Sequence, residues 1–201
     1  MAARGLAFLK GFLSPAPVVA VVAFLLLGVA GLSAGVWVWP AAWVFLAIYG
    51  GGSAVSYGLL AVLRPENYAM RQQGLIAKPA KKQPLIDALG LVGFVIWMAG
   101  WFAFIPLDVF RLKWLPAPAP ALQWAGVAAV AAGLLVAQLA IAQNRYATPT
   151  IHDQSAEGQR VVDTGLYGLV RHPLYAGLLL VYVGAALWMG STPRRSPRWV
   201  S

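Results

Sequence analysis

The chain has 201 residues, of which 60% are hydrophobic and 10% are charged. Soluble domains usually carry about 25% charged residues, so this composition indicates one polytopic membrane domain and excludes an ordinary soluble enzyme. The sequence has no cysteine and a formal net charge of +9. Disulfides and thiolate metal sites are therefore excluded, and the basic residues, which lie between apolar runs, favour membrane orientation over nucleic-acid binding.

Two apolar runs near the start predict the first two membrane-spanning helices, at about 17–36 and 41–63. A basic start before an apolar run is also typical of a secretory signal peptide. This run is longer than a usual signal core, however, and further spans follow it. Glycines 50–52 lie midway along the second run, where small residues favour close helix packing. The connection holds three tryptophans that predict an aromatic belt at the membrane interface: Trp37, Trp39 and Trp43.

The third and fourth spans are predicted at about 88–107 and 121–142. The basic loop before them, 64–87, is interpreted as a positive-inside anchor on anionic lipid rather than as a substrate-binding element. Trp97 and Trp101 are four residues apart, so they share a helix face and are interpreted as packing or lipid contacts. On the fourth span, small residues at every fourth position predict a tight helix contact: Ala129, Gly133 and Ala137.

A fifth helix is predicted to begin at Pro173 and to run to the end of the last apolar run. The residue before a proline avoids the α region, so His172 should precede the helix, and proline suits the first helical position. The first turn would present free N–H groups and the positive end of the helix dipole, which favour an anion. Arg171 adds donors, and the rings of Tyr167 and Tyr175 would suit a cation. Taken alone, Arg171 and His172 are also typical of a basic flank at the membrane edge.

The distribution of basic residues favours a cytoplasmic N-terminus. With that orientation ten basic residues lie on the inner side, and only Arg111 and Lys113 lie on the outer side before the tail. Such a bias follows the positive-inside rule. Both long loops, 64–87 and 144–171, would then face the cytoplasm, together with the start of the fifth helix.

The residues around the start of this helix also carry a recognisable motif. It resembles the signature of the isoprenylcysteine carboxyl methyltransferase family of integral membrane enzymes, roughly Gly-Pro-Tyr followed by Val-Arg-His-Pro-x-Tyr-x-Gly. Leu166 departs from the usual proline. The segments before the motif, 144–150 and 157–164, also look like bacterial members, and the resemblance extends over about 141–190, roughly a quarter of the chain. The matching residues are Gly165, Tyr167, Val170, Arg171, His172, Pro173, Tyr175 and Gly177.

The resemblance implies an S-adenosylmethionine-dependent methyltransferase that acts on a membrane-resident acceptor, either lipid-like or prenylated. S-adenosylmethionine carries a carboxylate and a sulfonium, which would suit the anion site and the tyrosine rings. No residue is assigned a catalytic role and no metal is expected. The expected partners are the lipid bilayer and the small lipophilic acceptor, not nucleic acid. The implied cofactor-binding residues are Tyr167, Arg171, His172, Pro173, Tyr175 and Gly177.

Two other functions stay open from the residues alone. A sterol-reductase-like membrane oxidoreductase has a similar helical core and uses a nicotinamide cofactor. The chain lacks a Gly-x-Gly-x-x-Gly loop, but such reductases need not use one. A non-enzymatic membrane protein, such as a transporter subunit or an assembly factor, is the other alternative. The spans hold few of the polar midplane groups that are typical of transporters.

We therefore expect an all-α polytopic membrane protein with about five transmembrane helices, which form one methyltransferase-like domain over residues 1–190. Its expected location is the inner (cytoplasmic) membrane of a bacterium, with the N-terminus and the Arg171-His172-Pro173 motif on the cytoplasmic side. The segment 191–201 is rich in Arg, Pro and Ser and would place three arginines outside. Family members instead continue with another helix and a tail that contains paired glutamates. We therefore expect a truncated or frame-shifted product, which could be inactive, rather than a short natural variant.

Overall fold

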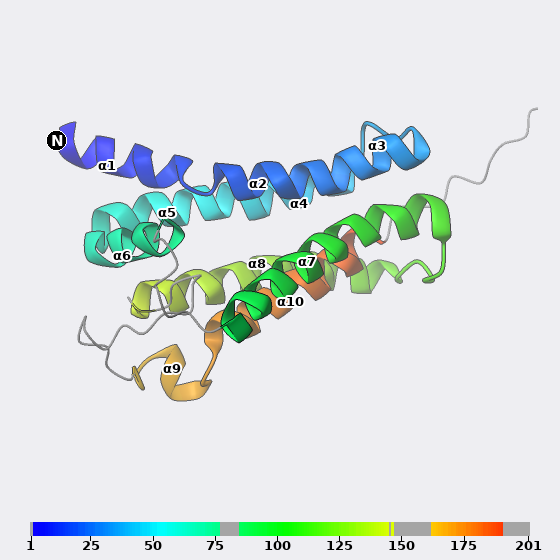
Figure 1. The fold of residues 1–201 in the computed structure, drawn as a ribbon. Coiled ribbons are helices and arrows are strands. Elements are labelled where there is room, and N and C mark those ends of the chain that lie inside the picture. The colour runs from blue at the N-terminus through cyan, green and yellow to red at the C-terminus, as the bar shows by residue number, and fades with distance from the viewer. Residues whose placement is uncertain (1, 77–84, 145, 147–161, 191–201) are drawn as a thin grey trace, which may run out of the picture.

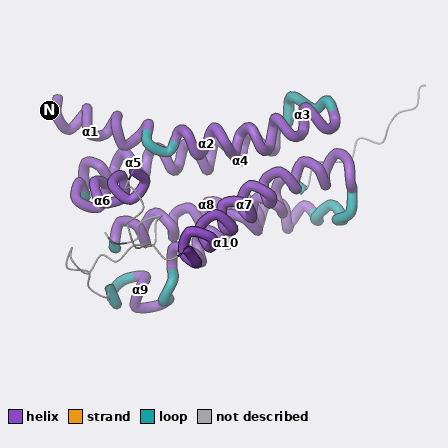
Figure 2. The backbone as a smooth tube through the Cα atoms, viewed as in Figure 1, coloured by secondary structure: helices purple, strands orange, loops and turns teal. Residues whose placement is uncertain are grey.

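The structure is a computed structural model that describes residues 2–76, 85–144, 146 and 162–190. These residues form helices joined by short turns, and no strand occurs among them (Figures 1 and 2). A fifth apolar helix of 17 residues, Pro173–Met189, accompanies four longer ones. The predicted all-α membrane bundle is therefore confirmed, whereas the tail at 191–201 lies outside the described residues. The four helical stretches that are long and apolar enough to cross a membrane are Ala2–Ala34, Pro40–Leu63, Val92–Leu112 and Pro120–Gln143.

The first two stretches run antiparallel along one side of the molecule (Figure 1). Pro40 occupies the first turn of the second stretch, where a missing N–H costs nothing. The π-helical segment η2 coincides with the glycine triplet, so the glycines lie where the helix is locally widened. The first stretch comprises α1 (Ala2–Leu13), α2 (Ala16–Ala23), η1 (Phe24–Gly28) and α3 (Val29–Ala34). The second comprises α4 (Pro40–Leu46), η2 (Ala47–Gly51) and α5 (Gly52–Leu63).

The remaining long helices pack beneath this hairpin, and two short ones lie at the end that holds the N-terminus (Figure 1). Helices α6 and α9 lie at that end, near the start of α10. The opposite end holds the turn after α3 and the connection between η3 and α8. The elements are α6 (Pro65–Ile76), α7 (Leu85–Leu107), η3 (Asp108–Leu112), α8 (Pro120–Gln143), α9 (Leu166–Leu169) and α10 (Pro173–Met189).

The third span continues beyond its predicted end because Asp108 is buried inside the helix rather than exposed in a loop. Its carboxylate oxygen Oδ1 accepts the backbone N–H of Trp114 at 2.8 Å and that of Leu115 at 3.2 Å. These bonds turn the chain back on itself, and Lys113 takes a left-handed conformation at φ 56°. Asp108 thus ends the helix one turn later than the apolar run indicates.

The closest helix contact joins α8 and α10 through facing glycines, which we call the glycine seam: Gly126 and Gly133 on α8, Gly177 and Gly184 on α10. A Cβ at Gly133 would lie 2.5 Å from the carbonyl oxygen of Gly177, and one at Gly184 would lie 2.6 Å from that of Gly126. The predicted small-residue contact on this span is confirmed at Gly133 and at Ala137, which is buried, whereas Ala129 is only half-buried.

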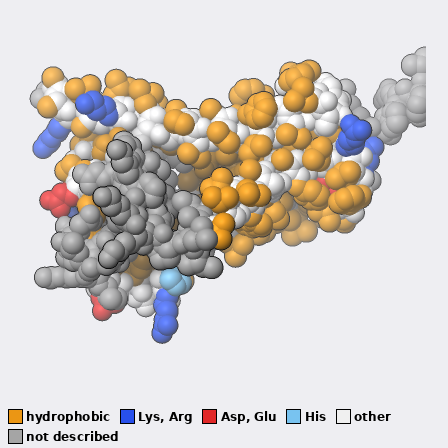
Figure 3. All heavy atoms as spheres, viewed as in Figure 1, with side chains coloured by type: hydrophobic (Ala, Val, Ile, Leu, Met, Phe, Trp, Pro, Cys, Tyr) orange, Lys and Arg blue, Asp and Glu red, His pale blue; other side chains and the backbone are white. Residues whose placement is uncertain are grey.

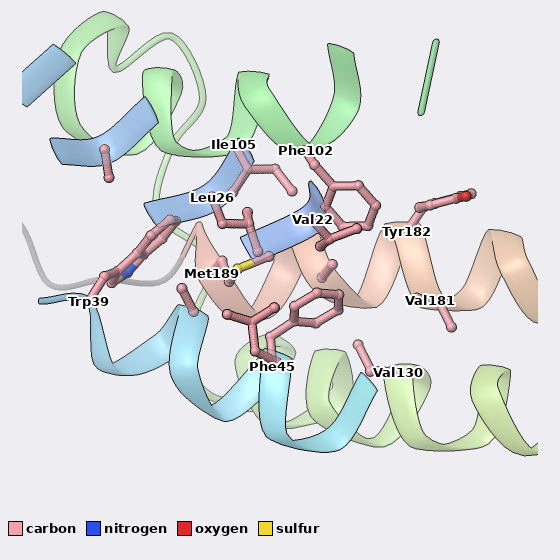
Figure 4. Close-up of a cluster of buried hydrophobic side chains, with 14 of the residues drawn as sticks. Val22, Leu26, Trp39, Phe45, Phe102, Ile105, Val130, Val181, Tyr182 and Met189 are labelled. Atoms are coloured by element: carbon pink, nitrogen blue, oxygen red, sulfur yellow. The ribbon is translucent and has the colours of Figure 1, made fainter. Parts of the chain in front are cut away.

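The core lies between the hairpin and the helices beneath it (Figure 4). Phe45 of α4 packs against Phe102 of α7 with a ring-centroid distance of 5.7 Å. Trp39 also belongs to this core, because only 1% of it is exposed and its ring meets Phe110 edge-on at 5.0 Å. The predicted interfacial belt is therefore wrong for Trp39. Its two neighbouring tryptophans are exposed: Trp37 by 60% and Trp43 by 54%.

The paired tryptophans of the third span make packing contacts, as predicted. The rings of Trp97 and Trp101 lie 6.1 Å apart, and Trp97 meets Tyr182 of α10 edge-on at 5.3 Å. Trp101 Nε1 donates to the carbonyl oxygen of Tyr182 at 3.1 Å. In Figure 3 hydrophobic side chains cover the length of the bundle, and the charged side chains lie mainly towards its two ends. This distribution is that of a bundle surrounded by lipid.

Candidate functional site

The start of α10 has the predicted geometry. His172 precedes the helix with non-helical dihedral angles (φ −131°, ψ 64°), and Pro173 occupies the first turn. The first backbone bond of the helix runs from the N–H of Ala176 to the carbonyl of His172 at 3.1 Å. The N–H groups of a first helical turn have no carbonyl partners within the helix, so they form a positive, donor-rich end.

Three of the six predicted cofactor-binding residues are exposed at this helix start. Arg171 and His172 are exposed, and 60% of Tyr175 is accessible. The rings of His172 and Tyr175 lie 5.8 Å apart, tilted by 30°. A ligand could therefore contact a guanidinium, an imidazole and a phenol ring together.

The other three predicted residues are buried or half-buried. Pro173 and Gly177 are buried, and a Cβ at Gly177 would lie 2.6 Å from the carbonyl oxygen of Gly133. Gly177 therefore faces α8 in the glycine seam and allows the two helices to approach. Tyr167 lies on α9, where it is half-buried. Its hydroxyl donates to the carbonyl of Ala140 on α8 at 3.5 Å.

The first residue of helix α9 is hydrogen-bonded to the C-terminal end of α8. The N–H of Leu166 donates to Gln143 Oε1 at 2.9 Å. Gly165 has a φ of +60°, and a Cβ there would lie 2.7 Å from the same Gln143 oxygen. Only glycine suits both the left-handed backbone and the close side chain. The first glycine of the motif thus shapes the turn that positions Tyr167.

Helix α6 docks on the same end of α8. Asn67 Nδ2 donates to the carbonyl of Ala142 at 2.9 Å and to that of Ile141 at 3.4 Å. The last carbonyls of a helix lack intrahelical partners, so an amide side chain that reaches them stabilises the helix end. One turn further along α6, Arg71 Nε donates to the hydroxyl of Tyr57 on α5, and the guanidinium lies 5.6 Å from the Tyr57 ring centroid.

These contacts create a group of half-buried polar side chains, here called the α8-end cluster, which consists of Tyr57, Asn67, Arg71, Asn144 and Tyr167. Burial raises the pKa of the Tyr167 phenol above its ordinary value, while a hydrogen bond with Asn144 and the charge of Arg71 oppose that rise. Arg71 is therefore close enough to act electrostatically on the motif tyrosine. The sequence did not indicate Tyr57 or Arg71, because one belongs to an apolar run and the other to a loop interpreted as a lipid anchor.

Replacing Arg71 with glutamine should raise the pKa of Tyr167 further, because the phenolate would lose a nearby positive charge. The measurement is an alkaline absorbance titration of the phenolate band. Subtracting the titration of a Tyr167→Phe variant, in the wild-type and in the Arg71→Gln background, isolates the Tyr167 signal from that of the other tyrosines. An unchanged or lowered Tyr167 pKa would show that Arg71 does not act on this phenol.

The described residues contain no group of three His, Cys, Asp or Glu side chains that could hold a metal ion. Three ionisable residues of the loop between α8 and α9 lie outside the described residues: His152, Asp153 and Glu157.

Residues 122–195 match the family model of phospholipid methyltransferases. The match includes nearly all of α8 and the whole of α9 and α10, and therefore both the glycine seam and the exposed helix start. This family is related to the isoprenylcysteine carboxyl methyltransferases that the motif resembles. No curated protein and no solved structure matches the chain. Over these residues the chain is therefore similar to membrane methyltransferases of the phospholipid type.

Proposed function

We propose that the chain is an S-adenosylmethionine-dependent methyltransferase of the membrane, whose acceptor is a lipid-like or prenylated molecule. The observation that carries this proposal is the family match over α8 to α10, with Arg171, His172 and Tyr175 exposed at the start of α10. When bound, S-adenosylmethionine supplies an electrophilic methyl group attached to a sulfonium.

The residues at this helix start suit the cofactor's two charges. The first-turn N–H groups of α10 and the Arg171 guanidinium are donors for a carboxylate. The exposed ring of Tyr175 offers a π-face to a sulfonium. Tyr167 lies on α9, just before this helix start, and its hydroxyl donates to the carbonyl of Ala140 on α8. His172, in ring contact with Tyr175, orients that ring or donates to the ligand.

The role of the protein in the transfer is mainly to position the reactants. Held by Arg171 and the first-turn N–H groups of α10, S-adenosylmethionine would supply the methyl group to the acceptor's lone pair, and the electron pair of the broken carbon–sulfur bond would stay on sulfur. A carboxylate acceptor is already ionised, so it needs no base, whereas an amine acceptor loses a proton after transfer. Holding the two reactants in line supplies roughly 7–11 kcal/mol of the barrier. We assign no catalytic residue.

The orientation of the chain belongs to the same proposal. We place the end with the N-terminus, α6, α9 and the start of α10 in the cytoplasm of a bacterial cell. Support comes from the described basic residues at that end, Arg4, Lys10, Arg64, Arg71 and Arg171, against Arg111 and Lys113 at the other.

Calorimetric binding of S-adenosylmethionine to the purified chain in an uncharged detergent tests the proposal. The wild type should bind saturably, and Arg171→Ala and His172→Ala should each weaken binding by about tenfold or more, because a charge-assisted contact is lost. Arg4→Ala is the matched control, since it removes the same charge from an exposed residue at the same end of the bundle. A folded wild type without binding would contradict the proposal, and equal losses in all three variants would contradict the site.

A further inference from the structure

We propose that Gln143 is a positioning residue for the cofactor site, because its amide oxygen holds α9 and thereby sets the place of Arg171. This inference rests on the proposed cofactor binding and deepens it, since it names a residue that fixes the motif loop. Gln143 is the last residue of α8, and it is 23 residues away from Leu166, the residue that it binds.

The contact joins the amide of Gln143 to the first residue of α9. Gln143 Oε1 accepts the N–H of Leu166 at 2.9 Å. The N–H groups at the start of a helix have no carbonyl partner within the helix, so a side-chain acceptor stabilises this end. Gly165, which precedes α9, has no side chain that could serve. Gln143 therefore supplies the acceptor from another helix.

The backbone at Gly165 leaves room for this amide group. A Cβ there would lie 2.7 Å from Oε1 of Gln143 and 3.0 Å from both Cδ and Nε2. With φ 60° and ψ −129°, Gly165 also has a conformation that residues with side chains rarely adopt. The first glycine of the motif and Gln143 therefore fit each other as a pair.

The contact matters because the side chains of α9 are at most half-buried. Leu169 is 83% exposed, while Leu166 and Tyr167 are half-buried. The hydroxyl of Tyr167 donates to the carbonyl of Ala140 at 3.5 Å, which is long for a hydrogen bond. The Gln143 contact is therefore the better formed of these two links between α9 and α8.

The connection from α9 to α10 transmits this position to the cofactor site. Three exposed residues, 170–172, separate the two helices, and three residues span at most about 10 Å. At its far end the connection is fixed, because the glycine seam packs α10 against α8. Arg171 therefore lies between two points that are both fixed on α8, and the Gln143 contact is one of them.

The test compares Gln143→Met with wild type, both as the full chain in an uncharged detergent. Methionine has a similar length, but its thioether accepts hydrogen bonds only weakly. Hydrogen exchange, followed by mass spectrometry, should become about fivefold faster in residues 166–170 and stay unchanged in α8 and α10. Calorimetry should show S-adenosylmethionine bound about fivefold more weakly, because the binding-competent placement of Arg171 is populated less often.

Two further variants attribute these effects to the acceptor oxygen at this position. Gln143→Glu keeps an acceptor oxygen at the same reach, so residues 166–170 should exchange as slowly as in wild type. Gln123→Met is the matched control, because Gln123 lies near the opposite end of α8 and donates to the carbonyl of Pro118 at 2.9 Å. It loses a side-chain hydrogen bond of the same length, and both readouts should equal those of wild type.

A double substitution tests whether Gln143 acts through Arg171. In the Arg171→Ala background, Gln143→Met should change the cofactor affinity by less than about twofold, because the contact that Gln143 positions is already absent. A full further loss in that background would overturn the inference. Unchanged exchange in Gln143→Met would overturn it too, and so would faster exchange with unchanged affinity. Absent cofactor binding by wild type contradicts the proposed function, and the exchange measurement then still decides whether Gln143 holds α9.

Discussion

Replacing Gly133 with alanine should destabilise the protein by about 2–3 kcal/mol, because the added methyl group has no space in the glycine seam. It would lie 2.5 Å from the carbonyl oxygen of Gly177 and 2.9 Å from the backbone nitrogen of Val181. Both are backbone atoms, so no change of rotamer relieves the clash. Helices α8 and α10 must move apart, and the contacts along their whole length weaken together.

The measurement is unfolding in mixed micelles, followed by circular dichroism. Gly93→Ala is the matched control, because Gly93 lies within α7 and a Cβ there meets nothing within 4 Å. That substitution should be neutral or stabilising by up to about 1 kcal/mol, since alanine favours the helix. Equal stability of the two variants would mean that α8 and α10 are not packed through this seam.

The helices were largely predictable from the sequence, while the contacts between them were only partly so. Apolar runs indicated the four stretches that are long enough to cross a bilayer and also the shorter apolar helix α10. The start of α10 followed from Pro173 and the residue before it. The repeat of small residues indicated a close contact at Gly133. It could not indicate Gly126 in place of Ala129, because the seam depends on where Gly177 and Gly184 of α10 lie.

The candidate site was also only partly predictable from the sequence. The motif indicated Arg171, His172 and Tyr175, which are neighbours in sequence and lie together at the helix start. Arg71 could not be found from sequence alone. It is 14 residues from Tyr57 and 96 from Tyr167, and only the docking of α6 and α9 on the same end of α8 brings them together.

Trp39→Ala should cost about 3–5 kcal/mol of unfolding free energy, the usual loss when a fully buried tryptophan is truncated. The prediction separates two roles that a tryptophan beside a membrane-spanning helix can have. An interfacial anchor contacts headgroups and lipid, which can fill the space of the missing ring. Trp39 instead packs inside the protein, with 1% of it exposed and Phe110 edge-on at 5.0 Å, so its truncation leaves a cavity.

Trp43 provides the control, because it lies four residues further on, within α4, and is 54% exposed. Trp43→Ala should change the unfolding free energy by about 0.5 kcal/mol or less. Both variants are measured by the same micelle unfolding, in two detergents of different headgroup. A core residue gives the same loss in both detergents, whereas an anchor gives a loss that changes with the headgroup. Similar, detergent-dependent losses in the two variants would mean that Trp39 lies at the membrane interface and does not pack against Phe110 of η3.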